Sequence, residues 1–402
     1  MRKRKTLPDD FCAAVAKLHV NGWSKDRIVR EFITGRSKHD VPAALKRAAE
    51  LGFLTRPELV PAACAAKGIS PEQIDAVILG GNLSAGLRAH SSSLRAIHVF
   101  YPSAPDVRAN FDRRLGDFAP FAARQVVDIM TRFASRSIGV SWGLTPRVII
   151  DALAEVDGVR GRARRKVFPI TGLPLHDYFP NRVASESAAK LHHIVNGAGA
   201  PFDFSIPLVP ALIPVGAEEL FQQLSEDYSP GFKEIFGSGP IGNRSGGLID
   251  SVDMILTSVS SDNALGQLLA VDAIHWAKIG NYADLQRRVA GDIGGVLLRK
   301  KRQSDQLLDE FARHWTGITR FQLERCARRA QGKNHPSAGV CVVAIDENKA
   351  AVVLKCLLTS HESAHDARHT GLISHLICDY SLAVRLLQLA KGAGAFSQPP
   401  TT

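Results

Sequence analysis

The sequence predicts an α/β protein in which a small N-terminal helical domain precedes a larger, Rossmann-like three-layer domain. Three observations predict this fold class. Apolar residues recur at helical spacing in the first 56 residues, six short runs rich in apolar and β-branched residues recur between residues 96 and 377, and helical stretches separate several of these runs. Alternation of strands with helices is typical of a mainly parallel sheet covered by helices on both faces.

The first part of the chain is predicted to form three short helices. Their inward-facing residues are Phe11, Val15 and Leu18 in the first helix, Ile28 and Phe32 in the second, and Val41, Leu45 and Ala48 in the third. Ser24 is placed to cap the second helix, and Gly52 ends the third. Three short helices with one basic face are typical of a helix-turn-helix domain, which we predict over residues 1–56. Any small helical bundle fits the same pattern.

The third helix is the one expected to enter the major groove of DNA. Pro42 lies inside it and is compatible with it only if the helix begins as late as Asp40, because proline has no backbone N–H. The residues predicted to contact DNA are Ser37, Lys38, His39, Ala43, Lys46 and Arg47.

The charge of the chain favours a polyanionic partner. The 402 residues carry a net charge of +11, and residues 1–58 hold 13 Lys and Arg against 7 Asp and Glu, or +6 of that total. A merely solubilising surface is the alternative explanation.

Other features of composition predict a cytoplasmic protein with no membrane partner. No apolar stretch reaches the roughly 18 residues of a spanning helix, and no apolar segment follows the basic start MRKRK. The six cysteines are scattered and form no CxxC pair, which argues against disulfides and against a thiolate zinc site.

Residues 57–94 have no clear pattern and are predicted to be a linker, and residues 95–398 are predicted to form the large domain. In parallel sheets of this kind, ligands bind beyond the carboxyl ends of the strands. The predicted strands are residues 96–100, 137–142, 166–170, 253–259, 339–345 and 373–377.

The loop in SIGVSWGLTPRVIIDAL, residues 137–153, is the most informative of the large domain. A strand leads into Ser141, Gly143 lets backbone amides approach a ligand, and Thr145 and Pro146 are expected as the cap and the first residue of a helix. The helix start supplies partial positive charge, and Ser141 and Thr145 supply hydroxyl donors. The loop therefore predicts an anion cradle suited to phosphate, although a strand-to-helix turn of this kind can also be purely structural.

Two further motifs lack the context that their function needs. GSGPIG (237–242) fits GxGxxG but follows a helical segment, so it is predicted to be a surface turn. HESAH (361–365) fits the HExxH pattern of zinc proteases, with His369 as a possible third ligand, but its neighbours are polar. We predict a solvated loop there and no metal.

Several segments, in order along the chain, resemble the SorC family (SorC/DeoR type) of bacterial transcriptional regulators. GWSKDRIVREF and SKHDVPAALKRAAELGFL are similar to the family's helix-turn-helix pattern with its LKRA element. SIGVSWGLT resembles the loop IGVGWGRT, VAGDIGGVLL resembles VGDICG segments, and LICDYSLAVRLLQLAK resembles the closing element of the family. DENKA, residues 346–350, is similar to the family's GEEKA helix start.

The resemblance implies a sugar-phosphate isomerase-type fold for the large domain, which would bind a phosphorylated sugar as effector. It further implies operator DNA as a partner, a homodimer or homotetramer, and neither catalytic residues nor a cofactor. Ser141, Gly143, Leu144, Thr145 and Lys349 would hold the phosphate, and Thr171, Gly172 and Asp292 would line the sugar.

Some positions depart from the family pattern. Pro42 and Ala43 replace the usual serine and arginine of the reading helix, Thr257-Ser258-Val259 replaces GIG, and Cys378-Asp379-Tyr380 replaces TDE. No arginine stands beside Thr171-Gly172. These changes affect the expected DNA sequence and the expected sugar more than the phosphate.

Two alternatives remain open. A sugar-phosphate isomerase or deaminase could use Asp292 or Asp379 together with Lys349. A protein that has lost DNA reading through Pro42 could instead be a ligand-binding partner of another regulator.

Overall fold

The computed structural model describes residues 7–21, 23, 25–32, 40–55, 58–59, 61–102, 110–161, 163–173, 183–202, 204, 209–227, 230–261, 277–300, 305–332, 337–358 and 371–393.

The large domain is built on one sheet of six parallel strands in the order β3-β11-β10-β6-β4-β5. Each strand overlaps one of the six runs predicted from the sequence, with β11 displaced by two residues, so the predicted α/β class is confirmed. The strands are β3 (Ala96–Phe100), β4 (Ser137–Val140), β5 (Lys166–Pro169), β6 (Met254–Thr257), β10 (Gly339–Ala344) and β11 (His375–Asp379).

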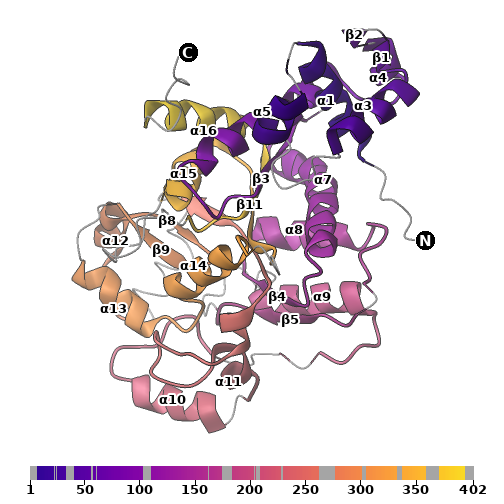
Figure 1. The fold of residues 1–402 in the computed structure, drawn as a ribbon. Helices are drawn as coiled ribbons and strands as arrows, with labels where there is room; N and C mark the ends of the chain where they lie inside the picture. Colours follow the sequence, from indigo (N-terminus) through magenta and orange to yellow (C-terminus); the bar gives the residue numbers. More distant parts are fainter. Residues whose placement is uncertain are drawn as a thin grey trace.

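Helices cover both faces of this sheet (Figure 1). Alternate residues of β10 enter different cores: Val340 and Val342 pack on one face, and Cys341 and Val343 pack on the other. This two-sided burial explains why the strands read as continuous apolar runs. The first face carries α5 (Pro71–Arg88), α14 (Arg320–Arg329), α15 (Ala350–Leu358) and α16 (Tyr380–Gly392), and the second carries α7 (Phe111–Arg132), α8 (Leu144–Leu153) and α9 (Ala184–Asn196).

A second, antiparallel sheet of three strands follows β6. It consists of β7 (Val259–Ser261), β8 (Val289–Ile293) and β9 (Val296–Arg299). Near it lie α12 (Tyr282–Arg288) and α13 (Gln306–His314), and Figure 1 shows α10 (Glu218–Asp227) and α11 (Pro230–Phe236) at the end of the molecule away from α1. A 3-10 turn, η2 (Leu248–Ser251), leads into β6.

The N-terminal part is helical, as predicted. It contains α1 (Asp9–Val20), α2 (Lys25–Arg27) continuing into a π-turn η1 (Ile28–Phe32), α3 (Asp40–Glu50), a hairpin of β1 (Leu54–Thr55) and β2 (Glu58–Leu59), and α4 (Pro61–Ala65). The predicted inward-facing residues of the three helices are buried together in one core. Pro42 is the third residue of α3, where its missing N–H has no helical partner to lose. The expected cap Ser24 lies outside the described residues.

The segment 57–94, expected to be a linker, contains α4 and the 18-residue helix α5. Ser70 and Gln73 form a capping box that starts α5. Gly81 of α5 packs against the ring of Phe32 in the N-terminal part, and Gly80 packs against the carbonyl of Ile97 in β3. Because α5 is buried on opposite sides, its sequence has no single apolar stripe, which is why the pattern is weak.

All six cysteines of the chain are buried free thiols. No helix among the described residues is both long enough and apolar enough to cross a membrane.

Candidate functional site

The loop between β4 and α8 lies where the chain reverses its direction along the sheet. From β4 the chain continues to β5 on one side, and β6 on the other side of β4 leads on toward β10. In doubly wound sheets, such a switch point is where ligands bind. The predicted anion cradle therefore lies at the position that the topology favours.

The helix α8 begins two residues earlier than predicted, so the expected cap at Thr145 is wrong. Gly143 is the N-cap residue, with φ +120° and ψ 156°, and it has no side-chain oxygen that could cap the helix. Glycine tolerates this conformation, so the chain turns directly into the helix. Leu144, Thr145 and Pro146 are the first three residues of α8. The backbone amides of Leu144 and Thr145 are N-terminal helix donors available to an anion.

The end of β6 forms the second wall of the cradle. A Cβ atom added to Gly143 would lie 3.3 Å from the hydroxyl oxygen of Ser258. Ser141 is buried and donates a hydrogen bond of 3.1 Å to the carbonyl oxygen of Trp142. Ser258 was not among the predicted site residues; it is the middle residue of Thr257-Ser258-Val259, which stands where the family pattern has GIG.

The turn between β8 and β9 lies over the cradle and carries Asp292 toward it. A Cβ atom on Gly294 would lie 3.0 Å from Oγ1 of Thr257 and 3.9 Å from Cβ of Ser141. Asp292 is buried; Ser260 donates its hydroxyl hydrogen to Oδ2, and the amide of Gly295 donates to Oδ1 at 3.0 Å. Burial raises the pKa of Asp292 to about 7, against the opposing influence of the Gly295 amide and the Lys349 charge.

Lys349 ends the 3-10 turn η5 (Glu347–Lys349) that follows β10, and its side chain is half-buried. Burial lowers its pKa, while the charges of Asp346, Asp292 and Asp379 act in the opposite direction. The lysine thus lies near the buried acid of the β8–β9 turn. Since β10 is bonded to β6, Lys349 stands at the same carboxyl edge of the sheet as the cradle.

A guanidinium from α7 completes this polar group, and sequence reasoning missed it. Arg114 Nη2 lies 3.9 Å from Oδ2 of Asp346, and its Nε lies 3.6 Å from Oδ2 of Asp379. Asp379 caps α16 by accepting from the amide of Leu382 at 3.1 Å, and burial raises its pKa. Asp346 has φ +93°, a strained conformation for a residue with a side chain. No local sequence motif marks Arg114, because it lies far earlier in the chain than its partners Asp346 and Asp379.

The structure places Thr171 and Gly172 after β5 but gives them different surroundings. Thr171 is buried, and its hydroxyl has no hydrogen-bond partner within the described part of the chain. Gly172 faces protein instead: an added Cβ atom would lie 2.5 Å from Oγ1 of Thr316 and 2.7 Å from the carbonyl oxygen of Pro210. Contact of these residues with a sugar stays a prediction.

The predicted DNA-contacting residues are described only in part. Ala43 and Lys46 are exposed on α3, and Arg47 is partly exposed, 3.5 Å from Asp9 and 3.8 Å from Glu50. Ser37, Lys38 and His39 lie outside the described residues.

The GSGPIG segment, residues 237–242, forms a turn after α11, as predicted, and a bridge between Ser238 and Ser245 closes it. The HESAH segment and His369 lie outside the described residues. In the part of the chain that is described, no group of three His, Cys, Asp or Glu side chains is placed to hold a metal ion.

The architecture defines a class: a doubly wound domain with its polar groups at a switch point, preceded by a small helical domain. Among solved structures, the full-length sorbitol operon regulator SorC from Klebsiella pneumoniae is similar, with a TM-score of 0.52 and 18% identity, over 94% of this chain and 99% of that one. A DeoR family transcriptional regulator from Listeria monocytogenes is also similar, with a TM-score of 0.51 and 18% identity, over 78% of this chain and 99% of that one.

These likenesses show that the chain has the fold of SorC and DeoR transcriptional regulators, as the sequence resemblance predicted. No family model matches the chain. No curated protein matches it in sequence either.

Proposed function

We propose that this protein is a cytoplasmic DNA-binding transcriptional regulator of carbohydrate metabolism, related to the SorC family, whose operator affinity is controlled by a phosphorylated sugar. The observation that carries the proposal is the order of the parts. A basic helical domain, a buried helix α5 and a body with polar groups at its switch point follow one another in a fold shared with a full-length regulator over 94% of this chain.

The DNA-binding half of the proposal rests on α3 and on charge. Lys46 projects into solvent from α3 while Val41, Leu45 and Ala48 hold the opposite face in the core. Residues 1–58 also carry +6 of the net charge of +11. A helix that exposes a lysine on a small rigid core is suited to the major groove.

Lys46→Ala tests this half. We expect DNA from the region upstream of the gene to bind more weakly, and the slope of log affinity against log salt to fall by about 1, because one phosphate contact is lost. Lys233→Ala, which removes an exposed lysine of α11, is the matched control and should change neither quantity. Equal behaviour of the two variants in a fluorescence anisotropy titration would count against α3 as the reading helix.

The effector half rests on the convergence of Gly143, Ser258, Asp292 and Lys349 at one edge of the sheet. Helix-start amides and the lysine suit a phosphate, and the buried carboxyl suits sugar hydroxyls. The effector would bind one arrangement of a homodimer or homotetramer better than another, and that arrangement would hold the DNA-binding domains at a different spacing. No catalytic step and no cofactor is part of this proposal.

Lys349→Met tests this half. We expect the affinity for the best ligand of a sugar-phosphate panel to fall by about 10- to 100-fold, the size of a lost charge-assisted hydrogen bond. Lys391→Met on α16 is the control, because Lys391 is exposed at the far end of that helix from Asp379. Calorimetry measures the ligand affinity of both variants. An unchanged affinity in Lys349→Met would remove the lysine from the site.

One observation favours the enzyme alternative. Asp292 has a pKa of about 7 and lies near Lys349, which are properties that a general base requires. Turnover of a sugar phosphate without DNA binding would move the protein to the isomerase or deaminase class. Phosphosugar binding without turnover and without salt-sensitive DNA binding would favour a ligand-binding partner of another regulator.

A further inference from the structure

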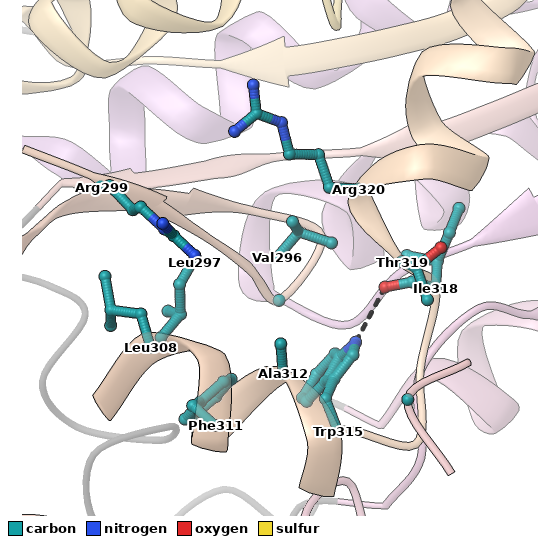
Figure 2. A pocket seen from close by; sticks show the side chains of 12 residues that line it. Val296, Leu297, Arg299, Leu308, Phe311, Ala312, Trp315, Ile318, Thr319 and Arg320 are labelled. Atoms are coloured by element: carbon teal, nitrogen blue, oxygen red, sulfur yellow. Dashed lines mark hydrogen bonds between the residues drawn. The ribbon is translucent and has the colours of Figure 1, made fainter. Parts of the chain in front are cut away.

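A separate cavity of about 190 Å³ lies between β9, α13 and the start of α14 (Figure 2). It does not contain the cradle residues Ser141 and Gly143, nor Asp292 or Lys349. Its lining includes Gly295, Arg299, Phe311, Ala312, Trp315 and Arg320.

The wall of this cavity is aromatic and aliphatic. Phe311 and Trp315, one turn apart, are stacked with ring centroids 6.0 Å apart. The indole N–H of Trp315 already donates to the carbonyl oxygen of Ile318 at 2.8 Å, the hydrogen bond drawn in Figure 2. The indole therefore contributes to the cavity as an apolar surface. A ligand here must present a mainly apolar body to this wall.

Two arginines give the cavity a polar side. Figure 2 shows Arg299 on the strand at the left of the view and Arg320 on the helix above, both on the far side of the view from Phe311 and Trp315. Arg299 is paired with Asp309, and Arg320 Nε is bonded to Oε1 of Glu324 at 3.0 Å. Such pairing orients the guanidinium groups. Each guanidinium has five N–H donors in a planar fork, which suits it to engage a second carboxylate.

The volume sets the size of the ligand. A dry cavity of about 150 Å³ is known to accept benzene, so 190 Å³ accommodates one ring with a short substituent. This is smaller than the roughly 300 Å³ or more of a site for a drug-sized molecule. The apolar wall disfavours a sugar, and the arginines favour a carboxylate over a neutral or cationic substituent.

We propose that this cavity is a second ligand site, which takes a small monocyclic aromatic carboxylate with its ring against Phe311 and Trp315 and its carboxylate toward Arg299 and Arg320. The proposal does not rest on the phosphosugar function, since Arg299, Phe311, Trp315 and Arg320 are not part of the cradle; the cavity meets that site only at Gly295, whose amide donates to Asp292.

Phenylacetate is the probe, and its neutral isostere phenylacetamide is the reference ligand. For a ligand of about ten non-hydrogen atoms we expect a dissociation constant on the order of 1 mM for phenylacetate, measured on the full chain by calorimetry and by tryptophan fluorescence. Phenylacetamide should bind at least about tenfold more weakly, because it lacks the negative charge that a carboxylate brings to the two guanidinium groups.

Three variants locate the binding. Ala312→Trp fills the cavity from an exposed position of α13 and should abolish phenylacetate binding. Arg320→Gln should remove most of the preference for phenylacetate over phenylacetamide. Arg313→Gln is the matched control. Arg313 is exposed on α13 and does not line the cavity, so this substitution should leave the affinities for phenylacetate and for phenylacetamide unchanged.

A thermal midpoint for each variant, measured without ligand, ensures that only folded protein is compared. Failure of phenylacetate to bind at tens of millimolar would overturn the proposal. Binding that survives Ala312→Trp, or an equal affinity for the acid and the amide, would overturn it as well. These outcomes leave the phosphosugar proposal untouched, because Lys349→Met tests that site separately.

Discussion

At the scale of single residues, Asp292 is a carboxyl group that burial moves far from its behaviour in water. Both of its oxygens accept hydrogen bonds, from Ser260 and from the amide of Gly295, yet burial still raises its pKa to about 7. Two hydrogen bonds thus do not offset the cost of burying the charge. A buried acid with this pKa makes the stability of the whole protein depend on pH.

The sign of that dependence follows from proton linkage. Between the ordinary pKa of 3.8 and about 7, the folded protein binds the proton of Asp292 more tightly than the unfolded chain does. The contribution of this residue to stability is therefore present below about pH 4 and is lost as the pH rises through 7. Its full size is roughly 4 kcal/mol, from about three pKa units.

Asp292→Asn should remove this pH dependence. We expect the difference in free energy of unfolding between wild type and variant to shift in favour of the variant as the pH rises from 4 to 7, since the amide cannot ionise. Urea unfolding midpoints at a series of pH values measure it. Asp157→Asn, at an exposed carboxylate, is the control. Parallel curves for wild type and Asp292→Asn would contradict the raised pKa.

At the scale of elements, the sequence was most informative for strands and least informative for helix starts. The six sheet strands could be predicted because burial on both faces leaves a continuous apolar run, as in GVCVVA of β10. The start of α8 lies two residues before the predicted one, because a Thr-Pro pair is a common helix start and the sequence does not reveal that Gly143 adopts φ +120°.

The site residues show the same division. Of the candidate site residues, Gly143 could be predicted from its own strand-to-helix loop, and Asp292 and Lys349 could be predicted only through the resemblance to the SorC family. Arg114 and Ser258 could not, since their contribution depends on which strands and helices are neighbours. Asp346 and Asp379 meet through Arg114 only after β10 and β11 have paired.

Gly143→Ala tests the element that forms the cradle. An alanine at φ +120° is strained, and its Cβ atom would lie 3.3 Å from the hydroxyl of Ser258, so we expect a loss of about 1–3 kcal/mol in unfolding free energy. Phosphosugar affinity should fall as well, because the amides at the start of α8 would be displaced.

Gly116→Ala provides the contrast. Gly116 is exposed in α7, and an added Cβ atom would meet nothing within 4 Å, so this substitution should stabilise the protein by about 0.5–1 kcal/mol. Urea unfolding of both variants measures the effects. A loss of stability in Gly116→Ala equal to that in Gly143→Ala would show that neither effect comes from the backbone angle of Gly143.

At the scale of the whole molecule, α5 is the element that joins the N-terminal part to the large domain. One side of it contacts Phe32 through Gly81, and another contacts β3 through Gly80. These contacts hold the N-terminal part on α5, which itself packs against the edge strand β3, rather than on a free linker. A ligand-induced change in the body can therefore reach the N-terminal part through a packed helix, which is what the proposed regulation requires.

Gly81→Ala should weaken this junction selectively. Its Cβ atom would lie 2.1 Å from the ring of Phe32, so the ring must move, and overpacking of this kind costs typically 1–3 kcal/mol. Because the clash is with the N-terminal part alone, we expect faster amide hydrogen exchange in α1 and α3 while exchange in β10 and β11 stays unchanged. Asn82→Ala, at the adjacent exposed position of α5, should alter exchange neither in the N-terminal helices nor in the sheet.

Faster exchange throughout the sheet in Gly81→Ala would mean that the two parts unfold as one unit, and unchanged exchange everywhere would mean that Phe32 does not hold the junction. The expected pattern, with the sheet protected and the N-terminal helices exposed, would identify the contact between Phe32 and Gly81 as the point where regulation could be uncoupled from ligand binding.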